Sequence, residues 1–465
     1  MNELGILEAL LRHGQGSRYY ATTPFQLEVL SIPQMPRDQF FEDERWTAGV
    51  VGLGYVGLPL LLTAAKQGLG GIGFDVSGER VDALNAGKSH IDDVSDEELE
   101  KALADGVEFT TDPARLTDAD VIFICVPSPL GRNRQPDLSY VEAAADTVEQ
   151  VVRPGQLISL ESTSYPGTTE DFFLPAIERA GYKLDDDDVY LAFSPERVSP
   201  GDDLKTGEIP KVVGGVTAES GRIAAIAYQR IVPAVHLVSS ARAAEMTKLM
   251  ENTYRAVNIG LVNEVAQLAH ELDIDIWEVI DAAATKPFGF QAFYPGPGVG
   301  GHCIPLDPQY LSWRAREANF ATRFIDTAEQ VNIQMPLYNV ARISDLLNER
   351  GFPVFGTHVL GVGISYKANI ADDRESASLE VLRGLAKRGA EISVLDPLVG
   401  DDRIRSHGFA PFSESDRLDG FTLAAVLTDH AGVDYERIAR EIPVVYDARG
   451  VYRRLGLSFD NVVPL

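Results

Sequence analysis

Residues 48–57 read AGVVGLGYVG, and this stretch decides the fold. An apolar run ends at Gly52, Gly54 and Gly57 complete a GxGxxG pattern, and an amphipathic helical pattern follows over 58–67. In this strand–turn–helix context, glycines permit a tight turn and the close approach of a pyrophosphate, whose charge the helix N-terminus favours. The stretch therefore predicts a Rossmann-type unit that binds a dinucleotide.

An acidic residue ends the next apolar run, GGIGFD, where a dinucleotide site needs one. Asp75 follows Gly57 by 18 residues, and a carboxylate at this strand end accepts hydrogen bonds from ribose hydroxyls. It also repels a 2′-phosphate, which favours NAD over NADP. The alternative, a glycine turn in a sheet that binds nothing, does not require strand, helix and acid in register. Beside the three glycines we assign Tyr55, Val56, Asp75 and Arg80 to the NAD site.

Strand patterns alternate with helical patterns on both sides of a helical middle. The runs AGVVGLGYVG, GGIGFDV, ADVIFICVP, GQLISLES and VYLAFSP precede it, and THVLGVGISYK, AEISVLDP, FTLAAVLTDH and IPVVYDARG follow it. Such alternation predicts βαβ units and parallel sheets. Residues 241–286 have the helical spacing of one long helix or two in succession. We expect two Rossmann-like doubly wound α/β domains joined by a central helical region. The expected boundaries are an N-terminal extension at 1–45, an NAD-binding domain at 46–238, a central and dimerising region at 239–350, and a second α/β domain at 351–465.

The bulk composition excludes several classes of partner. The 465 residues carry a formal net charge of −28, which opposes binding to nucleic acid or to anionic membrane surfaces. An anionic ligand must then be held by local amides, helix N-termini and a few cations. Two cysteines provide neither a disulfide framework nor a multi-cysteine metal site. No apolar run approaches a membrane span and no secretory leader is visible, so we expect a cytoplasmic protein without a metal.

A single thiol lies in the glycine-rich segment 295–308, PGPGVGGHCIPLDP. Cys303 is followed four residues later by Asp307, and a thiol there can attack a carbonyl carbon while loop amides hold an anionic substrate. The alternative is a glycine-rich turn before a buried cysteine, since small buried thiols are common. Cys125, within the apolar strand VIFICV, is most simply a core residue.

Polar residues at strand ends and on the central helix extend this candidate site. Thr163 lies in ESTS and Glu196 in SPER, both where a doubly wound sheet presents ligand contacts. Lys248 and Asn252 are four residues apart and therefore share one helix face. The alternative for the helix is a solvated face on which Glu251 pairs with Lys248.

Six motifs occur in a fixed order: GYVGLP, the ST strand end, SPER, KLMEN, PGPGVGGHC with an aspartate four residues later, and YKANIADDRES. Together they resemble the nucleotide-sugar 6-dehydrogenases, the UDP-glucose and UDP-N-acetylhexosamine dehydrogenase family, over residues 46–460 or so. The resemblance implies that the C6 alcohol of a UDP-sugar is oxidised twice by NAD⁺ to a uronic acid. The catalytic set that it implies is Cys303, Lys248, Asn252, Asp307, Glu196 and Thr163.

The resemblance also assigns a role to each group. Cys303 captures the aldehyde as a thiohemiacetal, which a second oxidation converts to a thioester. Lys248 and Asn252 stabilise the oxyanion. Asp307 and Thr163 position a water, and Glu196 assists thioester hydrolysis. Whether Lys248 or a water held by Asp307 takes the first proton stays open.

Further contacts follow from the same resemblance. Ser128, Thr163 and Arg374 join the NAD-binding residues. The substrate-binding set is Glu196, Lys248, Asn252, Tyr294, Gly298, Gly300, Gly301 and Lys367. Lys367, after the incomplete glycine pattern Gly361-Val362-Gly363, is expected to face the uridine end. Family members pair through the central helix, which predicts a homodimer or a higher homo-oligomer.

The identity of the sugar rests on residues around the thiol. His302 precedes Cys303 where UDP-glucose enzymes usually carry serine, and Lys286-Pro287 stands where they carry an arginine. The segment is most similar to bacterial UDP-N-acetylglucosamine 6-dehydrogenases of surface-polysaccharide pathways, with UDP-N-acetylmannosamine and UDP-glucose as alternatives.

Two rival functions are a catalytically inactive nucleotide-sugar sensor, which would not need the thiol, and an NAD-dependent 3-hydroxy-acid dehydrogenase, which needs neither the PGPGVGGHC loop nor a second α/β domain.

Overall fold

The computed structural model describes residues 39–42, 46–91, 94–131, 135–197, 206–301 and 303–465. His302 and most of the expected N-terminal extension lie outside these ranges. The first sheet contains β1 (Thr47–Val51), β2 (Gly70–Phe74), β3 (Glu108–Thr110), β4 (Val121–Ile124), β5 (Leu157–Leu160), β6 (Tyr190–Phe193), β7 (Lys211–Gly215) and β8 (Val235–Val238). Around it lie α1 (Gln39–Glu42), α2 (Gly57–Lys66), α3 (Gly78–Asn85), α4 (Asp96–Ala104), η3 (Pro113–Asp118), α5 (Ser139–Val151), η4 (Thr169–Phe173), α6 (Leu174–Arg179), η5 (Thr206–Glu208) and α7 (Ala218–Gln229).

The strand order of the first sheet is β3-β2-β1-β4-β5-β6-β7-β8, and its first six strands are parallel. This is the doubly wound order, which places a ligand crevice outside the carboxyl ends of β1 and β4. Val51 pairs with both Phe74 and Ile124, Ile124 with Leu160, and Leu160 with Phe193. The loops that follow these strands therefore begin along one edge, which we call the carboxyl edge. β7 departs from the expected parallel arrangement because it runs antiparallel to β6.

The strands are buried on both faces, as their continuous apolar runs predict. Alternate residues of β1 and β4 belong to two core clusters: Val50 and Phe123 lie in the one packed by α2 and α7, and Val51 and Ile124 in the one packed by α5 and α6. Phe41 of α1, 3% exposed, belongs to the first cluster although we assigned it to the N-terminal extension.

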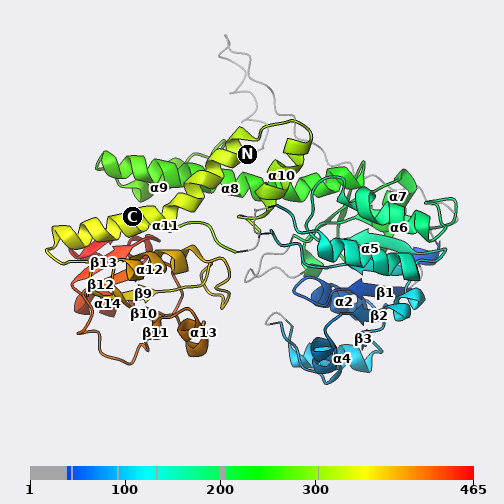
Figure 1. The fold of residues 1–465 in the computed structure, drawn as a ribbon, viewed down its shortest axis with the longest axis horizontal. Helices are drawn as coiled ribbons and strands as arrows, with labels where there is room; N and C mark the ends of the chain where they lie inside the picture. Colours follow the sequence, from blue (N-terminus) through cyan, green and yellow to red (C-terminus); the bar gives the residue numbers. More distant parts are fainter. Residues whose placement is uncertain (1–38, 43–45, 92–93, 132–134, 198–205, 302) are drawn as a thin grey trace, which may run out of the picture. The chain divides into compact units, whose positions relative to one another are not determined.

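Helices separate the two sheets in the sequence (Figure 1). They are α8 (Ala241–Glu271), α9 (Ile276–Ala284), α10 (Asp307–Glu317) and α11 (Arg323–Glu349). The pattern at 241–286 therefore forms two helices, and Asp275 caps the second by accepting from the N–H groups of Trp277 and Glu278. α8 and α11 pack side by side, and Gly260 permits this because a Cβ there would lie 3.0 Å from the backbone of Ala328.

The second sheet repeats the doubly wound order with all of its strands parallel. It contains β9 (His358–Val362), β10 (Glu391–Leu395), β11 (Ala410–Pro411), β12 (Leu423–Val426), β13 (Val444–Asp447) and β14 (Val462–Pro464), in the order β11-β10-β9-β12-β13-β14. Its helices are α12 (Ala377–Lys387), α13 (Asp401–Ser406), α14 (Tyr435–Glu441) and α15 (Val451–Arg454). α11 and α12 cover one face, and α14 and α15 cover the other. The predicted fold class is confirmed.

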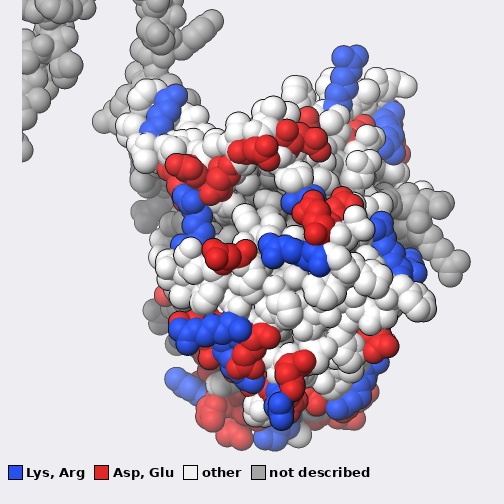
Figure 2. Space-filling model, turned by 90° about the vertical axis from the view of Figure 1, so that its left-hand side faces the viewer, with Lys and Arg blue, Asp and Glu red and all other residues white. Residues whose placement is uncertain are grey.

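Charged side chains of both signs are interspersed on the face drawn in Figure 2, where neither sign forms a broad continuous area. The contacts between α9 and α15 show how such charges pair: Arg453 donates to Asp275 at 2.9 Å and to Asp281 at 3.3 Å. Exposed pairs of this kind contribute little stability individually. α9 also contacts the glycine-rich segment, because Trp277 stacks on Tyr294.

Candidate active site

The turn after β1 has the geometry that a dinucleotide needs. Gly52 has φ +92°, and a Cβ there would lie 2.6 Å from the carbonyl oxygen of Cys125. A Cβ on Gly57 would lie 2.0 Å from the Gly52 oxygen, whereas one on Gly54 would meet nothing within 4 Å. Gly52 and Gly57 are thus required by the turn itself. The open space at Gly54, next to the N-terminus of α2, fits the close approach of a pyrophosphate.

Asp75 lies at the end of β2 and is fixed in its ionised form. Its carboxylate accepts from the N–H groups of Leu53 and Ser77, each at 2.9 Å, and from Arg80 at 2.7 Å. Burial opposes ionisation, but these donors outweigh it and hold the pKa of Asp75 below its ordinary value. Three donors leave an acceptor position on Oδ1 for a ribose hydroxyl. The residue type and its placement fit NAD.

The predicted cofactor residues Tyr55 and Arg374 come together although 319 positions separate them in the sequence. Tyr55 lies in the glycine turn and is 52% exposed, and the Arg374 guanidinium stands 5.3 Å from the centre of its ring. Asp372 accepts two hydrogen bonds from the Arg374 guanidinium and one from its backbone N–H. A cation that reaches the glycine turn from the second α/β domain is suited to a cofactor phosphate. Val56 is the N-cap residue of α2, and Ser128 lies after β4, where its carbonyl accepts from Tyr310 at 3.0 Å.

Cys303, Asp307 and the polar face of α8 form one cluster. The Asp307 N–H donates to the Cys303 carbonyl at 2.9 Å, and α10 begins at Asp307, four residues after the thiol. The Asp307 carboxylate accepts from the side-chain amide of Asn252, and Arg255 donates to the same amide's oxygen. Asn252 and Asp307 are 4% and 3% exposed. Helical spacing thus presents Lys248, Asn252 and Arg255 toward the thiol loop, as predicted for the first two.

Burial sets the protonation of both reactive groups in this cluster. Although Cys303 is exposed, the protein around it desolvates the sulfur, which raises its pKa with help from Asp307 and against Lys248, Arg255 and Arg374. Burial also raises the pKa of Asp307 to about 6, against the attraction of Lys248 and the hydrogen bond from Asn252. The resting group is therefore a thiol, and it needs a base or a nearby cation to react as a thiolate.

Glu196 follows β6 at the same carboxyl edge of the sheet and is 8% exposed. Its Oε1 accepts from the Arg197 N–H at 2.8 Å and its Oε2 from Lys211 Nζ at 3.0 Å. Arg197 in turn forms a two-bond ion pair with Glu251 of α8, at 2.6 and 3.2 Å. Glu251 therefore joins the SPER loop to α8, which contradicts its alternative role as a surface partner of Lys248.

Hydrogen bonds to Glu245 of α8 hold the loop that carries Thr163. Ser162 donates to the Val126 carbonyl at 2.7 Å, and Glu245, 1% exposed, accepts from the N–H groups of Gly167 and Thr169. Burial raises the pKa of Glu245 to about 7 despite these donors. Thr163 itself is half-buried. Glu245 lies one turn before Lys248, so the same helix positions both the loop and the lysine.

The glycines of the segment 295–301 are explained by packing against the second α/β domain. A Cβ on Gly300 would lie 2.7 Å from the Glu375 oxygen, and one on Gly301 would lie 2.8 Å from the Tyr366 ring. A Cβ on Gly298 would meet Ala377 at 2.8 Å. Close contact with the loop 366–377 therefore requires glycine at these positions, beside any contact with a sugar.

The same segment also contacts Arg449, α8 and α9. A Cβ on Gly296 would lie 2.9 Å from the Arg449 guanidinium, and the Gly296 N–H donates to Asn263 of α8 at 3.2 Å. Tyr294 stacks on Trp277 of α9 with ring centres 5.6 Å apart and is 48% exposed. The segment thus rests on both α8 and α9.

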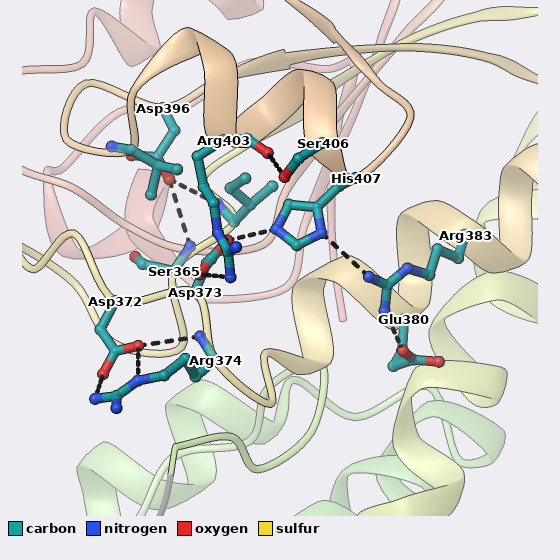
Figure 3. Close-up of polar contacts among 12 residues, drawn as sticks. Ser365, Asp372, Asp373, Arg374, Glu380, Arg383, Asp396, Arg403, Ser406 and His407 are labelled. Atoms are coloured by element: carbon teal, nitrogen blue, oxygen red, sulfur yellow. Dashed lines mark hydrogen bonds and ion pairs between the residues drawn. The ribbon is translucent and has the colours of Figure 1, made fainter. Parts of the chain in front are cut away.

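Buried carboxylates anchor the loop 366–376 in the second α/β domain (Figure 3). Asp373, 5% exposed, accepts two hydrogen bonds from Arg403, at 2.8 and 2.9 Å, and one from His407. Arg383 donates to the other ring nitrogen of His407, at 3.2 Å. These donors hold the pKa of Asp373 below its ordinary value although burial opposes them.

The end of β10 repeats the arrangement seen at Asp75. Asp396 accepts from the N–H groups of Ile364 and Val399, at 2.8 and 2.9 Å, which shapes the turn that leads to Lys367. Lys367 is half-buried in this turn, and its carbonyl accepts from Ser365 at 2.8 Å.

The sequence reasoning missed Glu161, Lys211, Glu245, Arg255 and Arg449. Arg255 was accessible from the pattern, because it follows Asn252 by three residues on the same helix face. Glu245 was accessible in the same way, because it precedes Lys248 by three residues on α8. The others are brought to the site by strand order or domain packing. In the described ranges, no three His, Cys, Asp or Glu side chains gather to hold a metal ion, and no helix is long and apolar enough to cross a membrane.

Comparisons with known proteins agree with this geometry over most of the chain. Models of the UDP-glucose/GDP-mannose dehydrogenase family match residues 47–232 as the NAD binding domain, 242–334 as the central domain and 360–454 as the UDP binding domain. Protein CapL of Staphylococcus aureus is 34% identical over 409 residues, which cover 86% of this chain and 95% of CapL.

Two further relatives carry named activities. The UDP-N-acetyl-D-glucosamine 6-dehydrogenase of Pseudomonas aeruginosa is 33% identical over 396 residues, covering 84% of this chain and 93% of that protein. The solved structure of the UDP-D-ManNAc dehydrogenase from Pyrococcus horikoshii superposes with a TM-score of 0.79 at 30% identity, covering 90% of this chain and 98% of the other.

Proposed function

The chain belongs to the UDP-glucose/GDP-mannose dehydrogenase family and is an NAD-dependent nucleotide-sugar 6-dehydrogenase, and we propose that its substrate is UDP-N-acetylglucosamine, which it oxidises to the uronic acid. The observation that carries the mechanism is the cluster of Cys303 with Lys248 and the buried Asn252–Asp307 pair. Bound NAD⁺ supplies a hydride acceptor in each of two oxidations. The protein's own groups supply the nucleophile, the charge stabilisation and the proton transfers.

We propose that Cys303 carries the substrate from the aldehyde to the acid. Its sulfur adds to the aldehyde carbon, which forms a thiohemiacetal, and loss of hydride then gives a thioester. Lys248 and Asn252 lie where a developing oxyanion needs donors. Because the pKa of the thiol is raised, Lys248 also serves to stabilise the thiolate. Water finally cleaves the thioester, with Glu196 as the base and Thr163 and Asp307 positioning that water.

The remaining binding roles follow from placement. Gly52, Gly54, Gly57, Asp75 and Arg374 hold NAD, together with Tyr55, Val56, Arg80, Ser128 and Thr163. The substrate is held by Glu196, Lys248, Asn252, Tyr294, Gly298, Gly300, Gly301 and Lys367. We assign the uridine end to the second α/β domain because Lys367 lies there and because residues 360–454 match a UDP binding domain.

The sugar itself is assigned from the relatives and from the thiol segment. The P. aeruginosa relative is named for UDP-N-acetylglucosamine, while the P. horikoshii structure is named for the mannosamine epimer at comparable identity. UDP-N-acetylmannosamine and UDP-glucose are therefore the competing substrates, and surface-polysaccharide synthesis is the proposed use of the product. Two unpaired cysteines favour the reducing cytoplasm as the location.

The substrate assignment is tested by incubating the purified protein with NAD⁺ and each UDP-sugar in turn while NADH absorbance is recorded. We expect the fastest turnover with UDP-N-acetylglucosamine and two NADH per uronate. Turnover with UDP-glucose alone would refute the assignment. Cys303→Ser should still bind NAD⁺ and the UDP-sugar in calorimetry but release no uronate.

We also propose that the protein forms a homodimer through contacts between the α8 helices of two subunits. Met250, Tyr254, Leu261, Leu268 and Leu272 lie within about 40° of one another around the helix axis and are 56%, 43%, 59%, 56% and 57% exposed. An exposed apolar stripe of this length is typical of a helix that pairs with another subunit. Leu261→Lys combined with Leu268→Lys should yield monomers in light scattering. Asp345→Lys, an exposed change on α11, should leave the dimer intact; a dimeric double variant would contradict the assignment.

A further inference from the structure

The antiparallel strand β7 brings a buried lysine to the carboxyl edge of the first sheet. Phe193 of β6 pairs with Gly214, so the first residue of β7, Lys211, lies beside the residues that follow β6. In a parallel strand the first residue would lie at the opposite edge. The reversal therefore places a cation directly beside Glu196, and Lys211 is 2% exposed.

Every hydrogen of the Lys211 ammonium has an acceptor. Nζ lies 2.5 Å from Glu161 Oε2, 3.0 Å from Glu196 Oε2 and 3.5 Å from the Pro195 carbonyl. Glu161, 1% exposed, uses its other oxygen to accept from the Tyr228 hydroxyl, which also contacts Ser159 at 2.8 Å. The ammonium is thus held rigidly between two carboxyl groups that come from different strand ends.

The charges of this cluster do not cancel. One ammonium faces two carboxyl groups in a site that excludes water, so ionising both leaves one uncompensated negative charge. Burial raises the pKa of Glu161, with Glu196 adding to it and Lys211 opposing it. The same two glutamates keep Lys211 charged, since they raise its pKa against burial. Loss of the cation would leave two acids close together, and the pair would then bind a proton more tightly.

We propose that Lys211 is a positioning residue for thioester hydrolysis, which holds the Glu196 carboxylate in a fixed orientation and in its ionised form. The inference rests on the proposed function of Cys303 and Glu196. In the hydrolytic step, Glu196 takes a proton from water while the water oxygen bonds to the thioester carbon. The carbon–sulfur bond then breaks, the sulfur leaves as a thiolate, and the acid is released.

The cluster acts on one half of the reaction because of where it lies. Among the residues that the structure describes, the titratable and charged groups that face it are Glu161, Glu196 and Tyr228, the neighbouring Arg197, and Cys125 directly after β4. The cations that act on Cys303 are instead Lys248, Arg255 and Arg374. Thioester formation therefore does not depend on Lys211, whereas its hydrolysis does.

The test uses Lys211→Met and Lys211→Arg in rapid-mixing experiments with NAD⁺ and the UDP-sugar that supports turnover. In the methionine variant the first turnover should still yield NADH at close to the wild-type rate, while uronate release slows by about 100-fold, the lower end of what a general base contributes. Acid-quenched enzyme should then carry the thioester on Cys303. The rate of uronate release should also reach half of its maximum at a higher pH than in the wild type, because Glu196 has lost its cation. Arginine should restore much of the hydrolysis rate.

Two outcomes would overturn the inference: a methionine variant that hydrolyses the thioester as fast as the wild type, or one that slows both half-reactions equally. If Lys211→Met does not fold, Lys211→Met combined with Glu161→Gln removes the cation and one acid together, and the same slow hydrolysis is expected. Failure of the proposed function gives a distinct result, because the wild type would then form no uronate from any UDP-sugar.

Discussion

Replacing Asp307 by asparagine should stabilise the protein at alkaline pH while it damages the enzyme. Burial raises the pKa of Asp307 from 3.8 to about 6, so the folded state binds the proton more tightly than the unfolded state. The stability that this proton provides is complete below pH 3.8 and is lost as the pH rises through 6. A difference of roughly two pKa units corresponds to about 3 kcal/mol.

This free energy predicts how the stability difference between Asp307→Asn and the wild type depends on pH. The free energy of unfolding of Asp307→Asn minus that of the wild type should be near zero at pH 4 and should reach about 3 kcal/mol at pH 8. Urea titrations followed by tryptophan fluorescence measure it, because Trp313 lies on the same helix, α10. Asp345→Asn, an exposed change on α11, is the control and should show no such pH dependence. A variant less stable than the wild type at pH 8 would refute the reasoning, since the carboxylate would then be a net source of stability.

Three further changes test other parts of the site. Gly57→Ala should abolish NAD⁺ binding in calorimetry, because its Cβ would lie 2.0 Å from a backbone oxygen, whereas Gly54→Ala should fold with an unchanged melting temperature and only weaken binding; equal affinities for the two variants would contradict this account. Asp373→Asn should raise KM for NAD⁺ by about tenfold, with a smaller effect on kcat, because the loop that holds Arg374 over its aromatic partner loses its anchor; an unchanged KM would argue against the anchor. Alkylation of Cys303, read by mass spectrometry, should accelerate at a higher pH in the folded enzyme than in the urea-unfolded chain, because burial raises the pKa of its thiol; fast alkylation at pH 6 would show a thiolate instead.

Local pattern was sufficient for much of the fold and of the site. The strand–turn–helix around Gly52 and the acid at Asp75 follow from short-range rules, as does the shared helix face of Lys248 and Asn252. Cys303 and Asp307 are likewise four residues apart, and the Asp307 N–H donates to the Cys303 carbonyl where α10 begins. In each case the residues that interact are close in sequence or lie at the ends of consecutive strands.

The remaining features depend on which elements become neighbours. The Arg197–Glu251 ion pair spans 54 residues and required the packing of α8 against the sheet. Lys211 reaches the carboxyl edge only because β7 is antiparallel, and KVVGG reads equally well in either direction. Arg449 lies against Gly296 through packing between domains. Such contacts leave no periodicity in the sequence, so charged residues that are buried in the structure looked like ordinary surface residues.

The measurement that tests the central claim most directly is the mass of the Cys303 peptide from wild-type enzyme quenched in acid during turnover with NAD⁺ and its UDP-sugar. We predict an added mass that corresponds to the uronyl sugar nucleotide in thioester linkage, which disappears at the rate of uronate release. An unmodified Cys303 peptide throughout a reaction that releases uronate would contradict the assignment of this thiol as the nucleophile.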